Sequence, residues 1–226
     1  MIKVNQVTGQ KEIDLLQRAD ILGFTLGRAG FELDDLARLR LGGQESSLSA
    51  AVGGGWALRD LVTVLDKLPC DYLEFTPAEP HDTAALAEEL EILACVDRPK
   101  IANGFFVLSD DDAVMRMEEH FESLRRHGVV LFQIEIDSRV DPGRLLPPKL
   151  SSRLDAFLTD FPCLISDDFR TLSGYPRSSA KGFFLNLDRD GGANYDLSDR
   201  AFAVSKVVTL LRDGEGRAAA GPEISS

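Results

Sequence analysis

Polar residues alternate with apolar ones in several short segments of the chain, and their types could carry acid-base chemistry. The clearest segment is 130–137, in which Gln133, Glu135 and Asp137 alternate with isoleucines. Successive side chains of a strand point to opposite faces, so this pattern predicts a strand with one apolar face and one acidic face. Crowded carboxylates raise the pKa of one of their number, which can then hold and donate a proton.

The same alternation recurs in three further segments, which carry Lys3 with Asn5, Glu74, and Asn186. Buried polar groups must be hydrogen-bonded or paired, so these segments indicate a site. The predicted catalytic residues are Glu74, Glu135 and Asp137, and the predicted substrate-binding residues are Lys3, Asn5, Gln133, Asn186 and Asp168. Two interpretations stay open: an acid-base set, or a buried ion-pair layer in which Lys3 supplies the counter-charge.

β-rich segments alternate with amphipathic segments along the chain, which is the pattern of repeated β-α units and a parallel sheet. The expected strands are Ile2–Asn5, Ile21–Leu26, Ser47–Val52, Asp71–Thr76, Lys100–Phe106, Val129–Ile136, Cys163–Ser166 and Gly182–Leu187. The expected helices are Lys11–Arg18, Asp34–Leu39, Ala57–Leu68, Thr83–Leu93, Asp111–His127, Ser151–Asp160, a poorly formed one at Thr171–Ala180, and Ser198–Arg212.

Eight such units in 226 residues predict an α/β fold, a single (β/α)8 TIM barrel with an eight-stranded parallel barrel inside a ring of helices. The barrel domain is expected to span residues 1–213. Residues 214–226 are rich in Gly, Ala and Ser and are expected to form a disordered tail. In such barrels the chemistry lies at the carboxyl-terminal ends of the strands.

The composition excludes several classes of function. A net charge of −12 argues against nucleic acid or an anionic membrane as a partner. Apolar runs stay well short of the roughly 18 residues that a membrane span requires, and the chain starts directly as a strand. We expect a soluble, cytoplasmic protein with a small-molecule substrate, acting as a monomer or homodimer.

The three cysteines and two of the histidines are expected to have no catalytic role. Cys70, Cys95 and Cys163 stand singly, without the pairing that marks disulfide or zinc scaffolds, and are expected in the core. His120 and His127 lie on or just after a predicted surface helix and are expected to be solvated.

Three segments resemble phosphoribosylanthranilate isomerase, a TIM-barrel enzyme of tryptophan biosynthesis. Ile2–Thr8 corresponds to the family's first strand, which typically reads Lys-Ile-Cys-Gly-Ile-Thr, and Ala19–Phe24 matches its Ala-Asp-x-x-Gly-Phe. Asp71–Phe75 is similar to its fourth strand. The resemblance extends from Ile2 to about Leu211 and rests mainly on the first 25 residues. It implies the barrel fold and proton-transfer chemistry of the isomerase or enolisation type.

The chain departs from the family at its catalytic positions. Asn5 stands where the family places its general-base cysteine, and an amide is no base near neutral pH. Gln6 replaces the glycine that follows, and Thr76 or Pro77 replaces a histidine. The resemblance assigns the family's general-acid aspartate to Asp137 or Glu135, a choice that spacing leaves open.

The family's phosphate sites are also altered. The loop after the second strand keeps Arg28 as its only cation, and the loops at 166–169 and 187–192 carry several carboxylates that would repel a phosphate unless Arg189 or a metal intervened. The hypothesis is therefore a divergent isomerase-like enzyme acting on a small polar metabolite that is less anionic than the family's. The alternatives are a non-catalytic binding or scaffold barrel, and retained family activity with a relocated base.

A second acidic cluster contains Asp188, Asp190, Asn194 and Asp196. Its start is similar to that of a calcium loop, but the spacing lacks the glycine at the sixth position and the terminal glutamate, so a turn is the favoured interpretation. We expect no cofactor and no metal, with a divalent cation at this cluster as the alternative.

Overall fold

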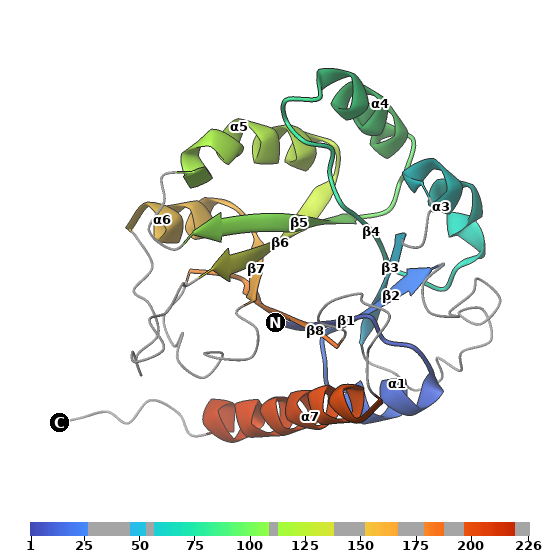
Figure 1. The fold of residues 1–226 in the computed structure, drawn as a ribbon, viewed down its shortest axis with the longest axis vertical. Helices are drawn as coiled ribbons and strands as arrows, with labels where there is room; N and C mark the ends of the chain where they lie inside the picture. The colour runs from blue at the N-terminus through green and yellow to red at the C-terminus, as the bar shows by residue number, and fades with distance from the viewer. Residues whose placement is uncertain are drawn as a thin grey trace.

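In the computed structural model the strands close into a parallel barrel in chain order, with each strand hydrogen-bonded to its neighbours and β1 to β8 (Figure 1). The structure describes residues 1–26, 46–52, 57–108, 113–137, 152–166, 179–187 and 197–219. The strands are β1 (Ile2–Asn5), β2 (Ile21–Leu26), β3 (Ser47–Val52), β4 (Tyr72–Phe75), β5 (Lys100–Leu108), β6 (Val129–Asp137), β7 (Cys163–Ser166) and β8 (Gly182–Asn186). The predicted eight-stranded barrel is confirmed.

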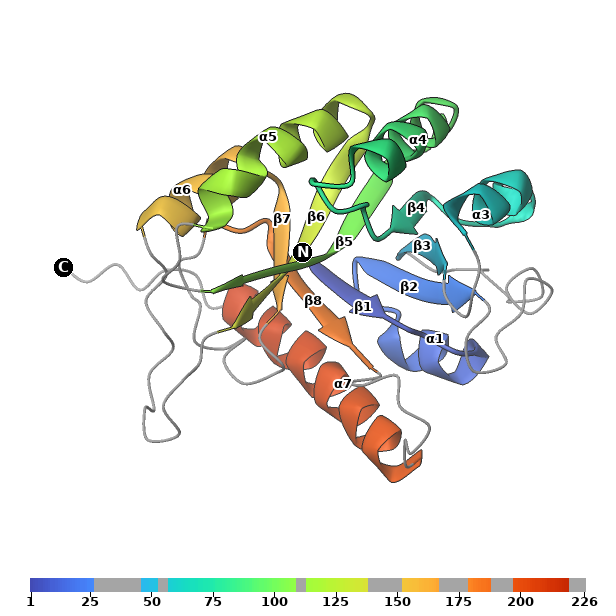
Figure 2. The same cartoon turned by 45° about the horizontal axis from the view of Figure 1, so that its top comes forward.

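Helices alternate with the strands and surround the barrel (Figures 1 and 2). They are α1 (Gln10–Leu16), α3 (Leu58–Val64) with the short η1 (Leu65–Lys67), α4 (Thr83–Ala94), α5 (Ala113–Arg126), α6 (Ser152–Asp160) and α7 (Leu197–Ala219). The helix expected at 34–39 and most of that expected at 171–180 lie outside the described residues. Because α7 continues to Ala219, the first residues of the expected tail are helical. Among the described residues, no helix has the length and apolar character to cross a membrane.

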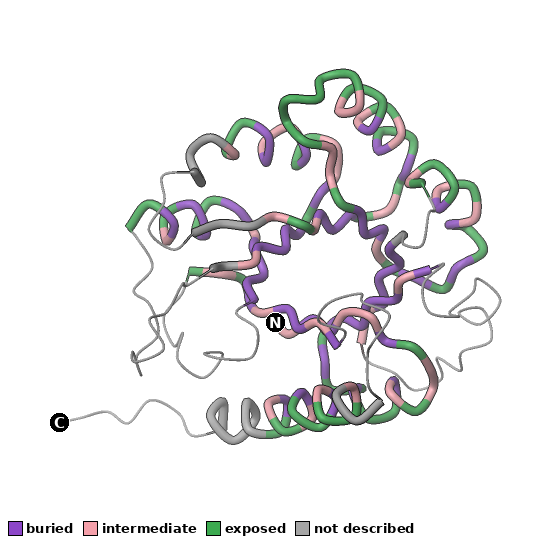
Figure 3. Tube along the Cα trace, in the orientation of Figure 1, coloured by how far each residue is buried: buried purple, intermediate pink, exposed green. Residues whose placement is uncertain are grey.

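The main core lies between the strands and the helices, so the strands form a largely buried ring (Figure 3). On α5, Phe121 and Leu124 are fully buried, as the apolar stripe of this helix predicts, and Phe121 stacks on Phe132 of β6 at 4.2 Å between ring centroids. His120 corrects an expectation, because it is only 7 % exposed and packs edge-on against Phe105.

The cysteines divide between core and surface. Cys70 and Cys163 are buried as expected, whereas Cys95 is exposed. Cys95 is the C-cap residue of α4, two positions after Leu93, the last buried residue of that helix. The prediction of a core position is therefore wrong for Cys95.

A second, smaller apolar layer fills the amino-terminal half of the barrel interior. It consists of Ile21, Ile101, Leu131, Leu164 and Phe184, each from a different strand, with Tyr72 packed beside it. Alternation along each strand then points the residue two positions later into the same interior, one layer nearer the carboxyl-terminal end. This apolar layer, called the apolar floor below, therefore leaves the carboxyl-terminal half of the interior to the polar side chains.

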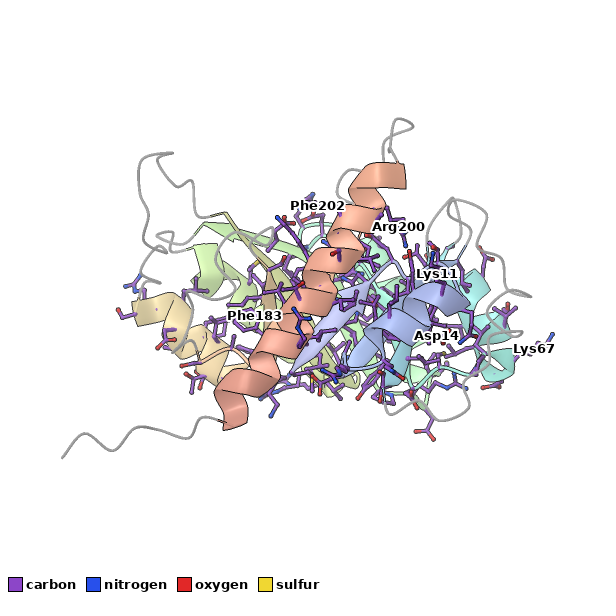
Figure 4. The ribbon with its side chains drawn as sticks, turned by 90° about the horizontal axis from the view of Figure 1, so that it is seen from below. Lys11, Asp14, Lys67, Phe183, Arg200 and Phe202 are labelled. Carbon is purple, nitrogen blue, oxygen red and sulfur yellow. The ribbon has the colours of Figure 1, made fainter. Side chains whose placement is uncertain are left out.

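Arg200 of α7 joins the last helix to the loop after β1. Its guanidinium donates to both carboxylate oxygens of Glu12 at 2.7 and 2.8 Å, and to the backbone carbonyl of Gln6 at 2.7 Å. In Figure 4, Arg200 lies on α7 where that helix passes α1. Gln6 has a φ of 65°, a left-handed conformation that is uncommon outside glycine, so Arg200 helps to hold a strained residue at the end of β1.

Candidate functional site

A buried ion pair lies at the centre of the barrel interior. Lys3 begins on β1 level with Ile21 and Phe184 of the apolar floor, and its long side chain extends to Glu74 of β4, where Nζ lies 2.8 Å from Oε2. Lys3 is 0 % exposed and Glu74 is 3 % exposed. Ser49 of β3 donates a further hydrogen bond to the same oxygen at 2.8 Å.

The ion pair belongs to a closed ring of four side chains. Gln133 of β6 donates through Nε2 to Glu74 Oε1 at 2.7 Å, and Asn5 of β1 donates through Nδ2 to Gln133 Oε1 at 2.7 Å. Lys3 closes the ring by donating to Asn5 Oδ1. Lys3 and Gln133 are buried with Glu74, and Asn5 is half-buried. The ring thus fixes the side chains of three strands to one another.

Two branches lead from this ring to the carboxyl-terminal ends of the strands. Asn186 of β8 accepts from Asn5 Nδ2 at 2.8 Å. Asn103 of β5 donates to Glu74 Oε1 at 3.0 Å, and the hydroxyl of Thr76, the residue after β4, donates to Asn103 Oδ1. Asn186 and Asn103 are half-buried and Thr76 is exposed, so the branches run from the dry interior to the mouth of the barrel.

Gly23 of β2 provides the space that the ion pair occupies. A Cβ at this position would lie 2.9 Å from Lys3 Nζ, 3.0 Å from Asn5 Oδ1 and 3.2 Å from Ser49 Oγ. These separations are closer than nonbonded atoms normally approach, so a larger side chain at residue 23 would displace the buried ammonium group or its partners.

The electrostatics of the pair determine the charge state of Glu74. Burial raises the pKa of the Glu74 carboxyl group, but the charge of Lys3 and the hydrogen bonds from Lys3, Asn103 and Ser49 outweigh it and hold the pKa below its ordinary value. Burial lowers the pKa of Lys3, and Glu74 opposes that shift. Among the predicted carboxylates, Glu74 is therefore not the one with a raised pKa, because its neighbours are a cation and hydrogen-bond donors. It is an ionised acceptor paired with Lys3.

Glu135 lies above the ring. Leu131, Gln133 and Glu135 alternate on β6, and because the first lies in the apolar floor and the second in the ring, the third lies on the interior face nearer the mouth. Glu135 is half-buried and its Cα pairs with Ser166 of β7. Asp137 is the last residue of β6.

Several predicted features lie outside the described residues. Asp168, Arg28 and Arg189 are among them, as are the acidic loop positions from 188 to 196. The proposed phosphate and cation interpretations of those loops therefore stay predictions.

Four residues of this network were missed as site residues by the sequence analysis: Gly23, Ser49, Thr76 and Asn103. Ser49 and Asn103 do lie on predicted strands, with apolar residues on both sides, so the alternation that revealed Glu74 could have revealed them. Thr76 was noted only as a replacement, and the role of Gly23 depends on the course of the Lys3 side chain, which comes from the neighbouring strand β1. No signal in the sequence indicates that contact.

Comparison with known proteins supports the fold. No family model and no curated protein sequence matches the chain. Among solved structures, the N-(5'-phosphoribosyl)anthranilate isomerase of Pyrococcus furiosus has a TM-score of 0.56 at 10 % identity, over 94 % of this chain and 98 % of that protein. The phosphoribosyl anthranilate isomerase of Thermococcus kodakaraensis has a TM-score of 0.56 at 15 % identity, over 94 % of this chain and 98 % of that protein. A 3-dehydroquinate dehydratase from Aquifex aeolicus VF5 has a TM-score of 0.50 at 13 % identity, over 91 % of this chain and 98 % of that protein.

These likenesses define a class and no more. The chain is similar over nearly its whole length to phosphoribosylanthranilate isomerases and to other TIM-barrel enzymes. At identities of 10–15 % this structural likeness shows the fold alone, so activity has to be argued from the site.

Proposed function

We propose that this protein is an enzyme that binds a small polar metabolite at the carboxyl-terminal mouth of the barrel and transfers a proton in an isomerisation or enolisation. The observation that supports this most is the hydrogen-bonded set of side chains anchored on the Lys3–Glu74 pair, whose outer members reach the mouth. Side chains fixed in advance can stabilise charge that develops in a transition state without reorganising.

The residues take separate roles in this proposal. Glu135, with Asp137 two residues farther along β6, supplies the proton-transferring carboxylate, since barrel enzymes place such groups at strand ends. Asn186 and Thr76 contact the substrate. Asn5, which is fixed by Gln133, holds Asn186 in place. Glu74 holds Asn103, to which Thr76 donates. Glu74, paired with Lys3, tunes the charge of the site. Asp168 stays a predicted binding residue in the loop after β7.

The substrate is proposed to be a neutral or weakly anionic compound. The polar groups described at the mouth are amides, a hydroxyl and a carboxylate, which suit carbonyl and hydroxyl groups better than a phosphate. The similar barrels include one named as an N-(5'-phosphoribosyl)anthranilate isomerase and one named as a 3-dehydroquinate dehydratase, and this analogy favours an enzyme that acts on a small metabolite.

The test is the thermal stability of the purified protein with and without ligands. The panel contains ribose 5-phosphate and other sugar phosphates, unphosphorylated hydroxy and aromatic acids, and Mg²⁺. A ligand at 100 times its Kd adds about 2.7 kcal/mol, which raises Tm by roughly 5–11 °C in a chain of this size. Stabilisation by an unphosphorylated acid, followed by turnover that Glu135→Gln abolishes while binding persists, would support the proposal.

Two other results would contradict the proposal. Stabilisation by sugar phosphates alone would contradict the proposed substrate class and would favour retained isomerase activity with a relocated base. Growth rescue of a tryptophan auxotroph that lacks the isomerase checks that alternative directly. Binding that Glu135→Gln and Asp137→Asn leave unchanged, with no turnover of any bound compound, would contradict a catalytic role.

One observation favours a second candidate, a non-catalytic barrel. The four ring residues hydrogen-bond to one another in a closed ring, as expected of a polar layer that only specifies the fold. Absence of stabilisation by every compound in the panel would support this candidate.

A further inference from the structure

The two ends of the buried ion pair have opposite hydrogen-bonding character. A lysine ammonium group has only donors, and an ionised carboxylate has only acceptors. The oxygen of Asn5 must therefore face Lys3, and the nitrogens of Gln133 and Asn103 must face Glu74. The amide orientations are thus determined by chemistry, and the ring is consistent with them because Asn5 Nδ2 meets Gln133 Oε1.

The branch toward β8 carries this direction outward. Asn5 uses one N–H for Gln133 and the other for Asn186, so Asn186 must present its oxygen inward. Its Nδ2 group, with two N–H donors, is then turned away from the ring, and no partner for it is found in the part of the chain that the structure describes. Turning this amide over would set two NH₂ groups against each other and lose the hydrogen bond.

In the branch toward β4, the hydrogen bonds run in the opposite direction. Asn103 gives its nitrogen to Glu74, so its oxygen faces Thr76, and the Thr76 hydroxyl must donate its only hydrogen there. The hydroxyl oxygen keeps acceptor lone pairs for any further contact. Thr76 is exposed at the mouth, and in a closed barrel of eight strands β4 lies across from β8.

We infer that the mouth of this barrel is directional and takes a ligand with a hydrogen-bond acceptor, a carbonyl or carboxylate oxygen, at Asn186 and a hydrogen-bond donor, a hydroxyl or amine, at Thr76. The inference rests on the proposed function, because it specifies the substrate class of the same site. A compound with acceptors at both ends would place one of them against the lone pairs of Thr76 and lose that contact.

Matched pairs of small acids test the direction. The probes are 4-hydroxybenzoate and 4-hydroxybutanoate against their methyl ethers, which keep the carboxylate and the ether oxygen but lack the donated hydrogen. Dissociation constants come from ligand-observed NMR titration of the wild-type chain and of Thr76→Val, Asn186→Leu and Thr63→Val. Thr63 is a matched control, because its hydroxyl donates to a carbonyl of its own helix, α3.

The expected result is that at least one hydroxy acid binds about tenfold more tightly than its ether. Thr76→Val should abolish this preference, and Thr63→Val should keep it. Asn186→Leu should weaken the acid and the ether alike, by about tenfold, since both use the carboxylate there.

Two kinds of failure are distinguishable. Binding of acid and ether with equal affinity, or a preference that survives in Thr76→Val, would overturn the directional inference and leave the proposed function standing. If none of these acids and no member of the thermal panel binds, the proposed function fails and the inference falls with it.

Discussion

Removal of the buried cation should be costly in a way that depends on pH. In Lys3→Met the carboxylate of Glu74 stays buried at 3 % exposure without its counter-charge, although three hydrogen bonds, from Ser49, Asn103 and Gln133, remain. Breaking a buried pair from one side costs about 3–5 kcal/mol, which in a chain of this size lowers Tm by roughly 6–20 °C at pH 7.

The sign of the pH dependence follows from the two pKa shifts. In the wild type the pKa of Glu74 is lowered, because Lys3 and the hydrogen bonds outweigh burial, so its contribution is present above the unfolded pKa and is lost as the pH falls through the folded pKa. In Lys3→Met burial acts without the cation and raises the pKa of Glu74. Protonation of Glu74 at low pH then removes the unpaired buried charge and stabilises the variant. The difference in stability should therefore shrink as the pH is lowered from 7 to 5.

Urea denaturation at both pH values measures this effect. The double variant Lys3→Met/Glu74→Gln should be more stable than Lys3→Met at pH 7, because it removes the unpaired buried charge. Arg59→Met is the control, since the Arg59–Glu88 pair has side chains 68 % and 62 % exposed and should be worth less than about 1 kcal/mol. A cost for Lys3→Met that is as small as the control, or that does not change with pH, would refute the reasoning.

Two further predictions concern stability. Gly23→Ala places a Cβ 2.9 Å from the buried ammonium nitrogen and should cost about 1–3 kcal/mol. Gly9→Ala, where no atom lies within 4 Å, should show only the smaller cost of alanine at the N-cap of α1, below about 1 kcal/mol, in the same urea titration. Burial raises the pKa of Glu89 to about 6, although a hydrogen bond from the Ala78 backbone opposes the shift. Because this folded pKa lies above the unfolded value, the free energy of unfolding of the wild type should fall by about 1–2 kcal/mol as the pH rises from 4.5 to 7. Thermal scans of Glu89→Gln should lack that loss, and an unchanged pH profile would contradict the assignment.

The interior face of the strands could be predicted from the sequence because it depends on local geometry alone. Alternation with a period of two placed Lys3, Asn5, Glu74, Gln133 and Asn186 on interior faces, and all of them meet in the hydrogen-bonded network. The helical period likewise predicted the buried stripe of α5. The barrel followed from counting the units.

Pairings across the barrel could not be predicted in the same way. Whether Glu74 faces another carboxylate or the Lys3 ammonium depends on which strands lie opposite each other after closure and on the reach of the lysine side chain. His120 was misplaced for a related reason. Its helix face looked polar, but contact with Phe105 of β5 makes that position interior, and burial lowers the pKa of the histidine against the charge of Glu79.

The presence of the buried ion pair is better explained by the amide orientations that it fixes than by a gain in stability. Taking two charges out of water costs about as much as their attraction returns, and well-packed apolar residues in the same place are often as stable or more so. Apolar residues at Lys3 and Glu74 would, however, leave the amides of Asn5, Gln133 and Asn103 free to turn either way. One group that can only donate and one that can only accept remove that freedom. The charges at the centre of the barrel interior therefore determine which groups Asn186 and Thr76 can offer at the mouth.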